Sequence, residues 1–321
     1  MFRKPSKKKV GIKMLIYGRE STGKTQFSLS APNIAMIDTE NGATFYEGTE
    51  VGKNIKLIAN TQSWKELDEA MDYIEENYES EGIETLVTDS LTKIRQNLSD
   101  AVLNVDIKRN RKNGVANADL NSNLSIRSWG TIGTISKRQS NRKIDLSSKM
   151  NIIDVAQLKN VTDDNGNVVD QIPDTDKSAP YDYDVKLKFY TEQQQGETKF
   201  YALVEKDRTR TYPVGTILEN PTFDNWSDVL DDVSDGEELQ TNYRKQVDES
   251  MEAYEEDIEK QEQTISDRFQ DIGKALDTGN RKLFVNELKE EKIDITKLDK
   301  LSKGQIDKIN VIFDKYEKLV K

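Results

Sequence analysis

The sequence predicts an α/β domain built on a mostly parallel sheet, followed by an acidic helical segment and a small helical module. Two observations carry this prediction. Over about the first 220 residues, short apolar runs that favour strands alternate with segments of helical spacing, as in parallel sheets covered by helices. After Pro221 the strand-like runs stop and acidic residues dominate. We therefore expect three parts, residues 1–222, 223–264 and 265–321.

The strands of the first part are expected where apolar and β-branched residues cluster. Residues 64–78 carry apolar side chains at helical spacing and are expected to form a helix. Residues 185–190 and 200–205 flank Gln195-Gly196 and are expected to pair as a hairpin. The other expected strands are 13–17, 34–38, 55–58, 84–89 and 151–156.

Charge divides the chain further. Segment 224–267 holds 16 acidic and 3 basic residues, which is typical of a solvated acidic helix or a partly disordered linker. Segment 93–149 holds 12 basic and 4 acidic residues, so it can present a basic face although the whole chain has a net charge of −11. From residue 265 onward, apolar groups separated by Gly279 and Gly304 predict three short amphipathic helices.

The composition excludes several kinds of chemistry. The chain has no cysteine and no histidine, which removes thiolate nucleophiles, imidazole bases and zinc sites built from those residues. Catalysis must then rely on carboxylates, Lys and Arg side chains, hydroxyls and backbone amides. No apolar run approaches the roughly 20 residues that span a bilayer. We expect no membrane partner and a cytoplasmic location.

A phosphate-binding loop is the strongest signal in the sequence. Residues 18–25 fit the eight-residue pattern of a glycine-rich loop ending in Lys-Thr, with a strand before it and a helix after it. Glycines allow the backbone amides to cradle phosphates, Lys24 would reach the β- and γ-phosphates, and the Thr25 hydroxyl would coordinate Mg²⁺. The expected nucleotide-binding residues are Gly18, Arg19, Glu20, Ser21, Thr22, Gly23, Lys24, Thr25 and Gln26.

Two acidic residues complete the expected ATP and Mg²⁺ site. Asp89 ends an apolar strand, where a carboxylate can hold Mg²⁺ together with Thr25. Ser90 and Leu91 follow it, so a second acid is not adjacent. Glu40 follows the strand at 34–38, where a carboxylate can face the γ-phosphate and polarise water.

Together, residues 20–25, 37–40 and 87–90 resemble the RecA recombinase core, and more closely the compact RecA-like ATPases of bacteriophages, some of which act in single-strand annealing and recombination. The resemblance covers about residues 12–221 and implies an oligomer with nucleotide sites shared between subunits. It implies that Glu40 is the catalytic base and that Gln157 senses the γ-phosphate. It also implies that Lys206 and Arg208 reach the nucleotide of a neighbouring subunit.

Single-stranded DNA is the expected partner of the basic segment. Residues 108–114 are expected to form a basic loop, and Arg142 and Lys143 extend the basic segment. Trp129 can stack on a base or pack in the core of its helix. The expected DNA-binding residues are Lys108, Arg109, Arg111, Lys112, Arg127, Trp129, Lys137 and Arg138.

The sequence therefore predicts an ATP-hydrolysing, DNA-binding protein of phage recombination or replication. The C-terminal module is expected to dock a single-strand-binding or replication protein. Two alternatives stay open. A small-molecule kinase would use the same loop with an acceptor pocket, and a nucleotide-dependent scaffold would use ATP only to assemble.

Overall fold

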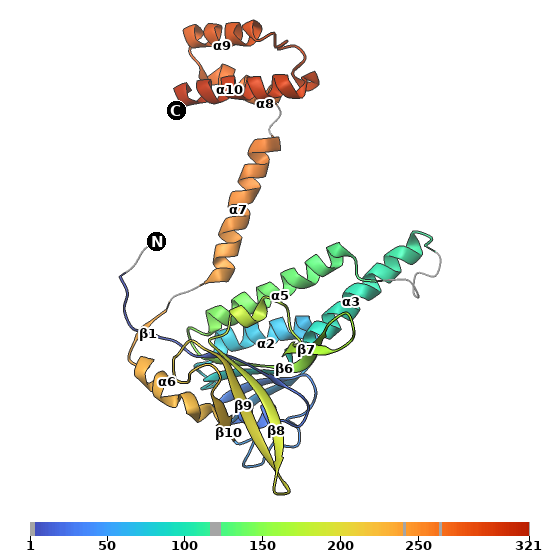
Figure 1. Cartoon of the computed structure of the whole chain (residues 1–321). Helices are drawn as coiled ribbons and strands as arrows, with labels where there is room; N and C mark the ends of the chain where they lie inside the picture. Colours follow the sequence, from blue (N-terminus) through green and yellow to red (C-terminus); the bar gives the residue numbers. More distant parts are fainter. Residues whose placement is uncertain (1–3, 116–122, 240–241, 263–264, 321) are drawn as a thin grey trace. The chain divides into compact units, whose positions relative to one another are not determined.

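The computed structural model describes residues 4–115, 123–239, 242–262 and 265–320 (Figure 1). It divides into two compact units, Met1–Arg244 and Lys245–Lys321. The first unit is an α/β domain with a mostly parallel sheet, so the predicted fold class is confirmed. Within the described residues, no helix is both long and apolar enough to cross a membrane.

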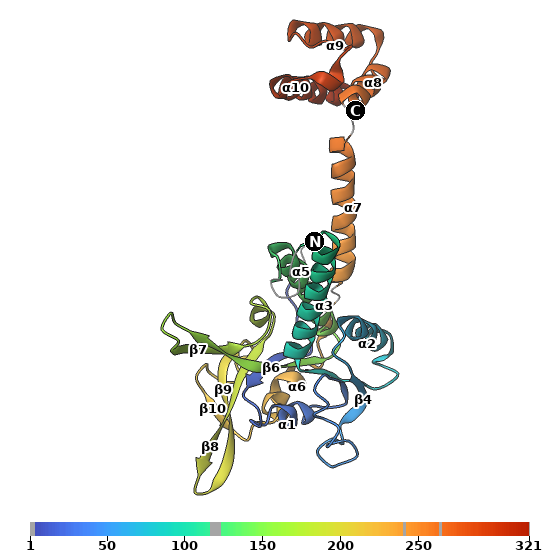
Figure 2. The same ribbon diagram turned by 90° about the vertical axis from the view of Figure 1, so that its right-hand side faces the viewer.

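In the described part of the first unit, nine strands form the main sheet, in the order β10-β9-β8-β2-β6-β5-β3-β4, with β7 paired to β6. The pairings from β8 through β4 are parallel, whereas β9, β10 and β7 pair antiparallel to their neighbours. The predicted hairpin is confirmed as β8 and β9, which extend together beyond the sheet (Figures 1 and 2). The strands are β2 (Lys13–Gly18), β3 (Ile34–Asp38), β4 (Ile55–Asn60), β5 (Thr85–Asp89), β6 (Asn151–Thr162), β7 (Val168–Pro173), β8 (Val185–Gln194), β9 (Glu197–Asp207) and β10 (Ile217–Glu219).

Alternate residues of each parallel strand enter two different cores because successive side chains point to opposite faces of a sheet. Ile153 packs with Phe27 on one face, where α1 (Lys24–Leu29) and α6 (Ser227–Val233) lie. Ile152 packs with Leu67 on the other face. That face is covered by α2 (Trp64–Asn77), α3 (Leu91–Lys112) and α5 (Ile126–Leu146).

The strand order decides which loops meet. β6 lies between β2 and β5, and Gly18 and Asp89 are registered with Gln157 and Val155 of β6. The carboxyl ends of β2 and β5 therefore lie at one edge of the sheet, on either side of residues 155–157 of β6. Ligands of open α/β sheets bind at that edge.

The first unit continues past the expected boundary at residue 222. Phe223 and Trp226, on the short 3₁₀ helix Phe223–Trp226, are buried in the core, with Trp226 edge-on to Phe27 at 6.2 Å between ring centroids. The sequence did not predict this burial, because most charged residues near Phe223 and Trp226 are acidic and suggest a solvated segment. The linker assignment for these residues is wrong.

Some of the acidic residues of segment 224–267 already have basic partners. β1 (Lys8–Lys9) pairs in parallel with β11 (Glu237–Glu238), and Lys8 forms an ion pair with Glu237 at 2.5 Å. Lys7 contacts Asp235 at 2.9 Å. The lysines before the first sheet strand therefore hold the chain that follows α6.

We predict that Trp226→Ala lowers the free energy of unfolding by about 3–5 kcal/mol, because it leaves a large cavity and removes the ring contact to Phe27. Urea unfolding followed by circular dichroism measures the change. Trp129→Ala is the matched control, since that ring is exposed and should cost less than about 0.5 kcal/mol. Equal losses for the two variants would contradict the core assignment.

The second unit contains the three predicted helices. They are α8 (Ile265–Ala275), α9 (Thr278–Glu290) and α10 (Lys303–Val320), and they bury Phe284 and Phe313 between them. α7 (Tyr243–Glu262) precedes them and carries most of the remaining acidic residues. The Asp277 side chain caps α9 by accepting hydrogen bonds from the Gly279 and Asn280 amides, so the helix begins at Thr278. Gly279 and Gly304, expected at breaks, lie instead in the first turns of α9 and α10.

Candidate nucleotide site

The phosphate-binding loop joins β2 to α1 in a conformation that depends on its glycines. Gly23 has φ of +90°, which favours glycine, and Ser21 also lies in the left-handed region with φ of +57°. At Gly18, a Cβ atom would come within 2.4 Å of the Phe189 carbonyl oxygen. The Thr22 hydroxyl donates to the Arg19 carbonyl at 2.8 Å and closes the loop. The positive φ angles and this hydrogen bond fix the shape of the loop.

Lys24 lies folded over this loop. Its ammonium group donates to the carbonyl of Arg19 and lies 3.4 Å from the Thr22 hydroxyl. Burial lowers the pKa of Lys24, while Asp89 and Glu40 act in the opposite direction. A phosphate group would provide the half-buried ammonium with a stronger partner than a carbonyl oxygen.

Thr25 and Asp89 meet across the sheet edge. The Thr25 hydroxyl donates to Asp89 Oδ2 at 2.8 Å. Burial raises the pKa of Asp89 to about 6, although the Thr25 hydrogen bond lowers it. A hydroxyl and a carboxylate oxygen side by side fit Mg²⁺, which prefers hard oxygen ligands and keeps several waters.

Glu40 is held by two side chains from neighbouring strands. Its Oε1 accepts one hydrogen bond from the Ser90 hydroxyl at 2.7 Å and another from Gln157 Nε2 at 2.7 Å. Ser90 is buried, and its amide donates to the Thr39 hydroxyl at 2.7 Å. The carboxylate is thus fixed where β3 and β5 end, beside Gln157 midway along β6.

The turn that carries Glu40 is organised by Asp38. This buried carboxylate accepts hydrogen bonds from the amides of Glu40, Gly42 and Ala43, at 3.1, 3.2 and 2.8 Å. Asp38 therefore uses its charge to shape the loop, and Glu40 points to the cavity. The sequence predicted Glu40 and Gln157 but missed Ser90, whose only signal was its place after the strand-terminal Asp89.

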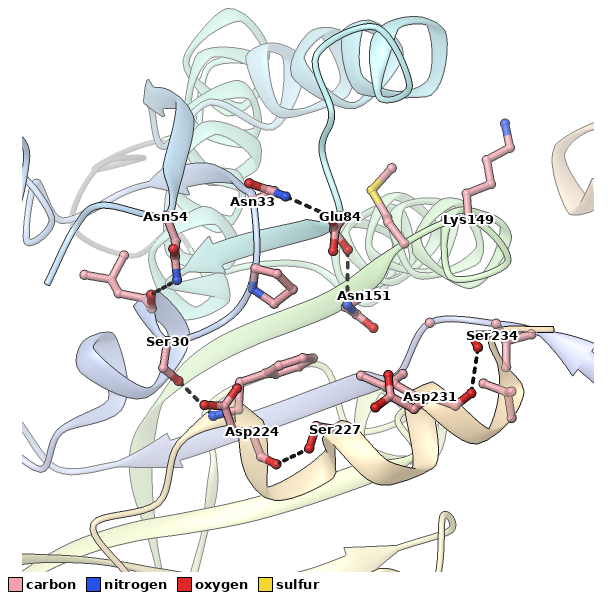
Figure 3. Close-up of a pocket in the computed structure, with 18 of the residues that line it drawn as sticks. Ser30, Asn33, Asn54, Glu84, Lys149, Asn151, Asp224, Ser227, Asp231 and Ser234 are labelled. Atoms are coloured by element: carbon pink, nitrogen blue, oxygen red, sulfur yellow. Dashed lines mark hydrogen bonds between the residues drawn. The ribbon is translucent and has the colours of Figure 1, made fainter. Parts of the chain in front are cut away.

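Most of the residues predicted for the nucleotide site line one cavity of about 510 Å³. Thr22 and Gly23 belong to the loop without lining the cavity. Gln26 is exposed and instead lines a separate cavity of about 1050 Å³ at the opposite edge of the sheet, between α1 and α6 (Figure 3). The residues around the first cavity are Gly18, Arg19, Glu20, Ser21, Lys24, Thr25, Asp38, Glu40, Gly42, Asp89, Ser90, Val155, Ala156, Gln157, Leu158 and Asn160.

Lys206 and Arg208 lie away from the loop of their own chain. Lys206 is paired with Lys186 at the start of β8, whereas Gly18 of the loop is paired with Phe189, about 10 Å further along that strand. The Lys206 ammonium donates to the carbonyls of Pro180 and Tyr181 at 3.0 and 3.2 Å. Arg208 also donates to the Tyr181 carbonyl, at 3.1 Å. The structure therefore does not bring these two cations together with the phosphate loop of the same chain.

Asp207, between these two cations, fixes the segment that follows β9. Its Oδ2 accepts from the Trp226 indole at 3.1 Å and from the Tyr212 amide at 3.1 Å, and its Oδ1 accepts from the Thr209 amide at 2.8 Å. Trp226 also contacts Phe27 of α1. One aromatic side chain thus connects the helix after the phosphate loop to the base of the Arg208 segment.

The predicted DNA-binding residues fall on two helices that lie side by side (Figures 1 and 2). Residues 108–112 are the last turns of α3, so the expected basic loop is wrong there. Trp129 of α5 is 48% exposed, with the Arg95 guanidinium 6.0 Å from its ring centroid, which rules out core packing. The DNA-binding candidates are Lys108, Arg109, Arg111 and Lys112 on α3, and Arg127, Trp129, Lys137 and Arg138 on α5.

Two residues counted in the basic segment are neutralised inside the protein. Arg142 is buried and contacts Asp68, Asp72 and Glu75 of α2, at 3.2, 2.7 and 2.9 Å. Lys143 is buried against Asp154 of β6 at 2.5 Å. Their expected place on the basic face is wrong, because acidic partners distant in sequence hold them in the fold.

Comparison with known proteins identifies the first unit. Residues 10–211, more than half of the chain, match the family model described as AAA domain. Among solved structures, the chain is similar to the KaiC-like protein PH0186 from the hyperthermophilic archaeon Pyrococcus horikoshii OT3, with 13% sequence identity and a TM-score of 0.40. That match covers 66% of this chain and 90% of the archaeal chain. No curated protein sequence matches this chain.

Proposed function

Since the chain belongs to the AAA-domain family, we propose that it is a Mg²⁺-dependent ATPase that assembles into a homo-oligomer and binds single-stranded DNA. One observation carries the ATPase proposal. The phosphate loop, the Thr25–Asp89 pair and the Glu40–Gln157 pair all line one cavity. These are the parts that phosphoryl transfer to water requires.

Each part would have a separate role. The loop amides and Lys24 would bind the β- and γ-phosphates, and Mg²⁺ held by Thr25 and Asp89 would neutralise their charge. Glu40 would accept a proton from the attacking water. Both hydrogen bonds to Glu40 reach Oε1, so Oε2 can face that water. Gln157 would sense the γ-phosphate, and its hydrogen bond to Glu40 would couple the presence of that phosphate to the position of the carboxylate.

The DNA proposal depends on the basic residues of α3 and α5, because such side chains neutralise phosphates without reading sequence. The resemblance to phage RecA-like ATPases supports a role in recombination or replication. Docking of a single-strand-binding or replication protein on the C-terminal helices is a further part of the proposal.

Turnover of ATP with and without single-stranded DNA tests the proposal. We expect Mg²⁺-dependent phosphate release that DNA changes, and that Lys24→Ala abolishes while the melting temperature stays normal. Lys53→Ala is the control, because this exposed lysine pairs with Glu50 outside the cavity. Phosphate transfer to a small molecule would favour a kinase instead. Nucleotide-dependent assembly without turnover would favour a scaffold.

Ser90→Ala is predicted to lower kcat about tenfold and to leave KM for ATP nearly unchanged, because it frees one side of Glu40 without touching the phosphate loop. Steady-state phosphate release measures both constants. Ser99→Ala is the control, since it removes a hydroxyl that donates to the Arg95 carbonyl elsewhere on α3. An unchanged kcat in Ser90→Ala would show that Glu40 is not positioned by this bond.

A further inference from the structure

A groove of about 680 Å³ runs between α3 and α5. It is separate from the nucleotide cavity and from the cavity beside α6, because it shares no lining residue with either. Its lining is mostly apolar. The apolar lining residues are Trp64, Leu98, Ala101, Val102, Val105 and Ile135.

The rim of this groove is basic and rich in amides. Arg109 of α3 and Arg127 of α5 both line it, from opposite helices. Asn110, Asn113 and Asn123 add amide groups that can donate and accept hydrogen bonds. The last turns of α3 continue the positive charge beyond the groove.

Asp106 is the single carboxylate among the described residues that line the groove. The Ser128 hydroxyl of α5 donates to its Oδ2, so this acid ties the two helices together. An apolar slot with two guanidinium groups and several amides at its rim is complementary to a ligand that has a flat apolar group beside negatively charged groups. Its basic rim suits phosphates, and its apolar lining suits a flat, weakly polar ring.

We propose that this groove binds an unstacked base of single-stranded DNA, with the neighbouring phosphates on Arg109 and Arg127. The inference rests on the proposed DNA binding and specifies its form. A base inside a duplex is stacked and paired, and cannot enter the groove without being extruded. A single strand offers its bases freely, so the groove selects single strands with little sequence preference.

The test compares two fluorescently labelled strands of equal length and charge, oligothymidine and an abasic strand, in anisotropy titrations with the full chain. We expect oligothymidine to bind about tenfold more tightly, since each buried base adds stacking energy. Ala101→Phe should fill the groove from its exposed wall and reduce oligothymidine binding to the abasic level. It should leave binding of the abasic strand unchanged.

Two further variants separate base binding from charge and from folding. Asn104→Phe adds the same ring on an exposed α3 position outside the groove, and should keep the wild-type preference. Arg109→Gln should weaken binding of both strands to the same extent, and should make the affinity depend less steeply on salt concentration. Equal binding of the two strands, or an unchanged preference in Ala101→Phe, would overturn the groove inference while the DNA proposal stands. Binding of neither strand would overturn both.

Discussion

Glu40→Gln is expected to bind ATP as tightly as the unmodified protein and to hydrolyse it about 10²–10⁴-fold more slowly, the usual cost of losing a positioned base. The glutamine keeps the size of the side chain, so Ser90 and Gln157 can still contact it. Single-turnover phosphate release measures the rate, and binding of a fluorescent ATP analogue measures affinity.

Gln157→Ala is the informative companion to this variant. It removes the second hydrogen bond to Glu40 but leaves the carboxylate in place. Its rate should therefore fall less than that of Glu40→Gln. If Glu40→Gln turns over at the normal rate, the base is another residue and the cluster around Glu40 has only a structural role.

The sequence predicted the parts of this site that local patterns encode. The phosphate loop is a continuous motif between a strand and a helix, and Asp89 and Glu40 each follow an apolar strand. The contacts between them depend on strand order, which no local pattern contains. The Ser90–Glu40 bond forms because β5 lies beside β3.

Long-range packing explains the errors in the same way. Trp226 lies among acidic residues, and only the fold shows that its ring fills the core beside Phe27. Arg142 looked like part of a basic surface, yet its partners lie 67 to 74 residues earlier on α2. Charge counts along a chain describe a surface only where tertiary partners do not neutralise the charges.

The second large expected effect is a loss of ATP hydrolysis when Lys206 and Arg208, the cations proposed to act on a neighbouring subunit, are removed. We predict that the double variant Lys206→Ala/Arg208→Ala hydrolyses ATP at least about 10³-fold more slowly, as when an arginine finger is lost. Within one chain these cations contact Pro180 and Tyr181, so the loss would arise at the nucleotide of a neighbour. The fold should be preserved, because Asp207 and Trp226 still hold the segment.

Mixing experiments distinguish this shared site from a purely structural role. An equal mixture of the double variant with Glu40→Gln should recover activity, since about one quarter of randomly formed interfaces combine an intact Glu40 with intact cations. Mixing Glu40→Gln with Lys24→Ala is the control. Both changes lie in the same cavity of one subunit, so no mixed interface restores a complete site and activity should stay absent. Recovery in the first mixture but not in the second would establish that the cations act across the interface. No recovery in either, with subunit exchange verified by a labelled chain, would reject their action in trans.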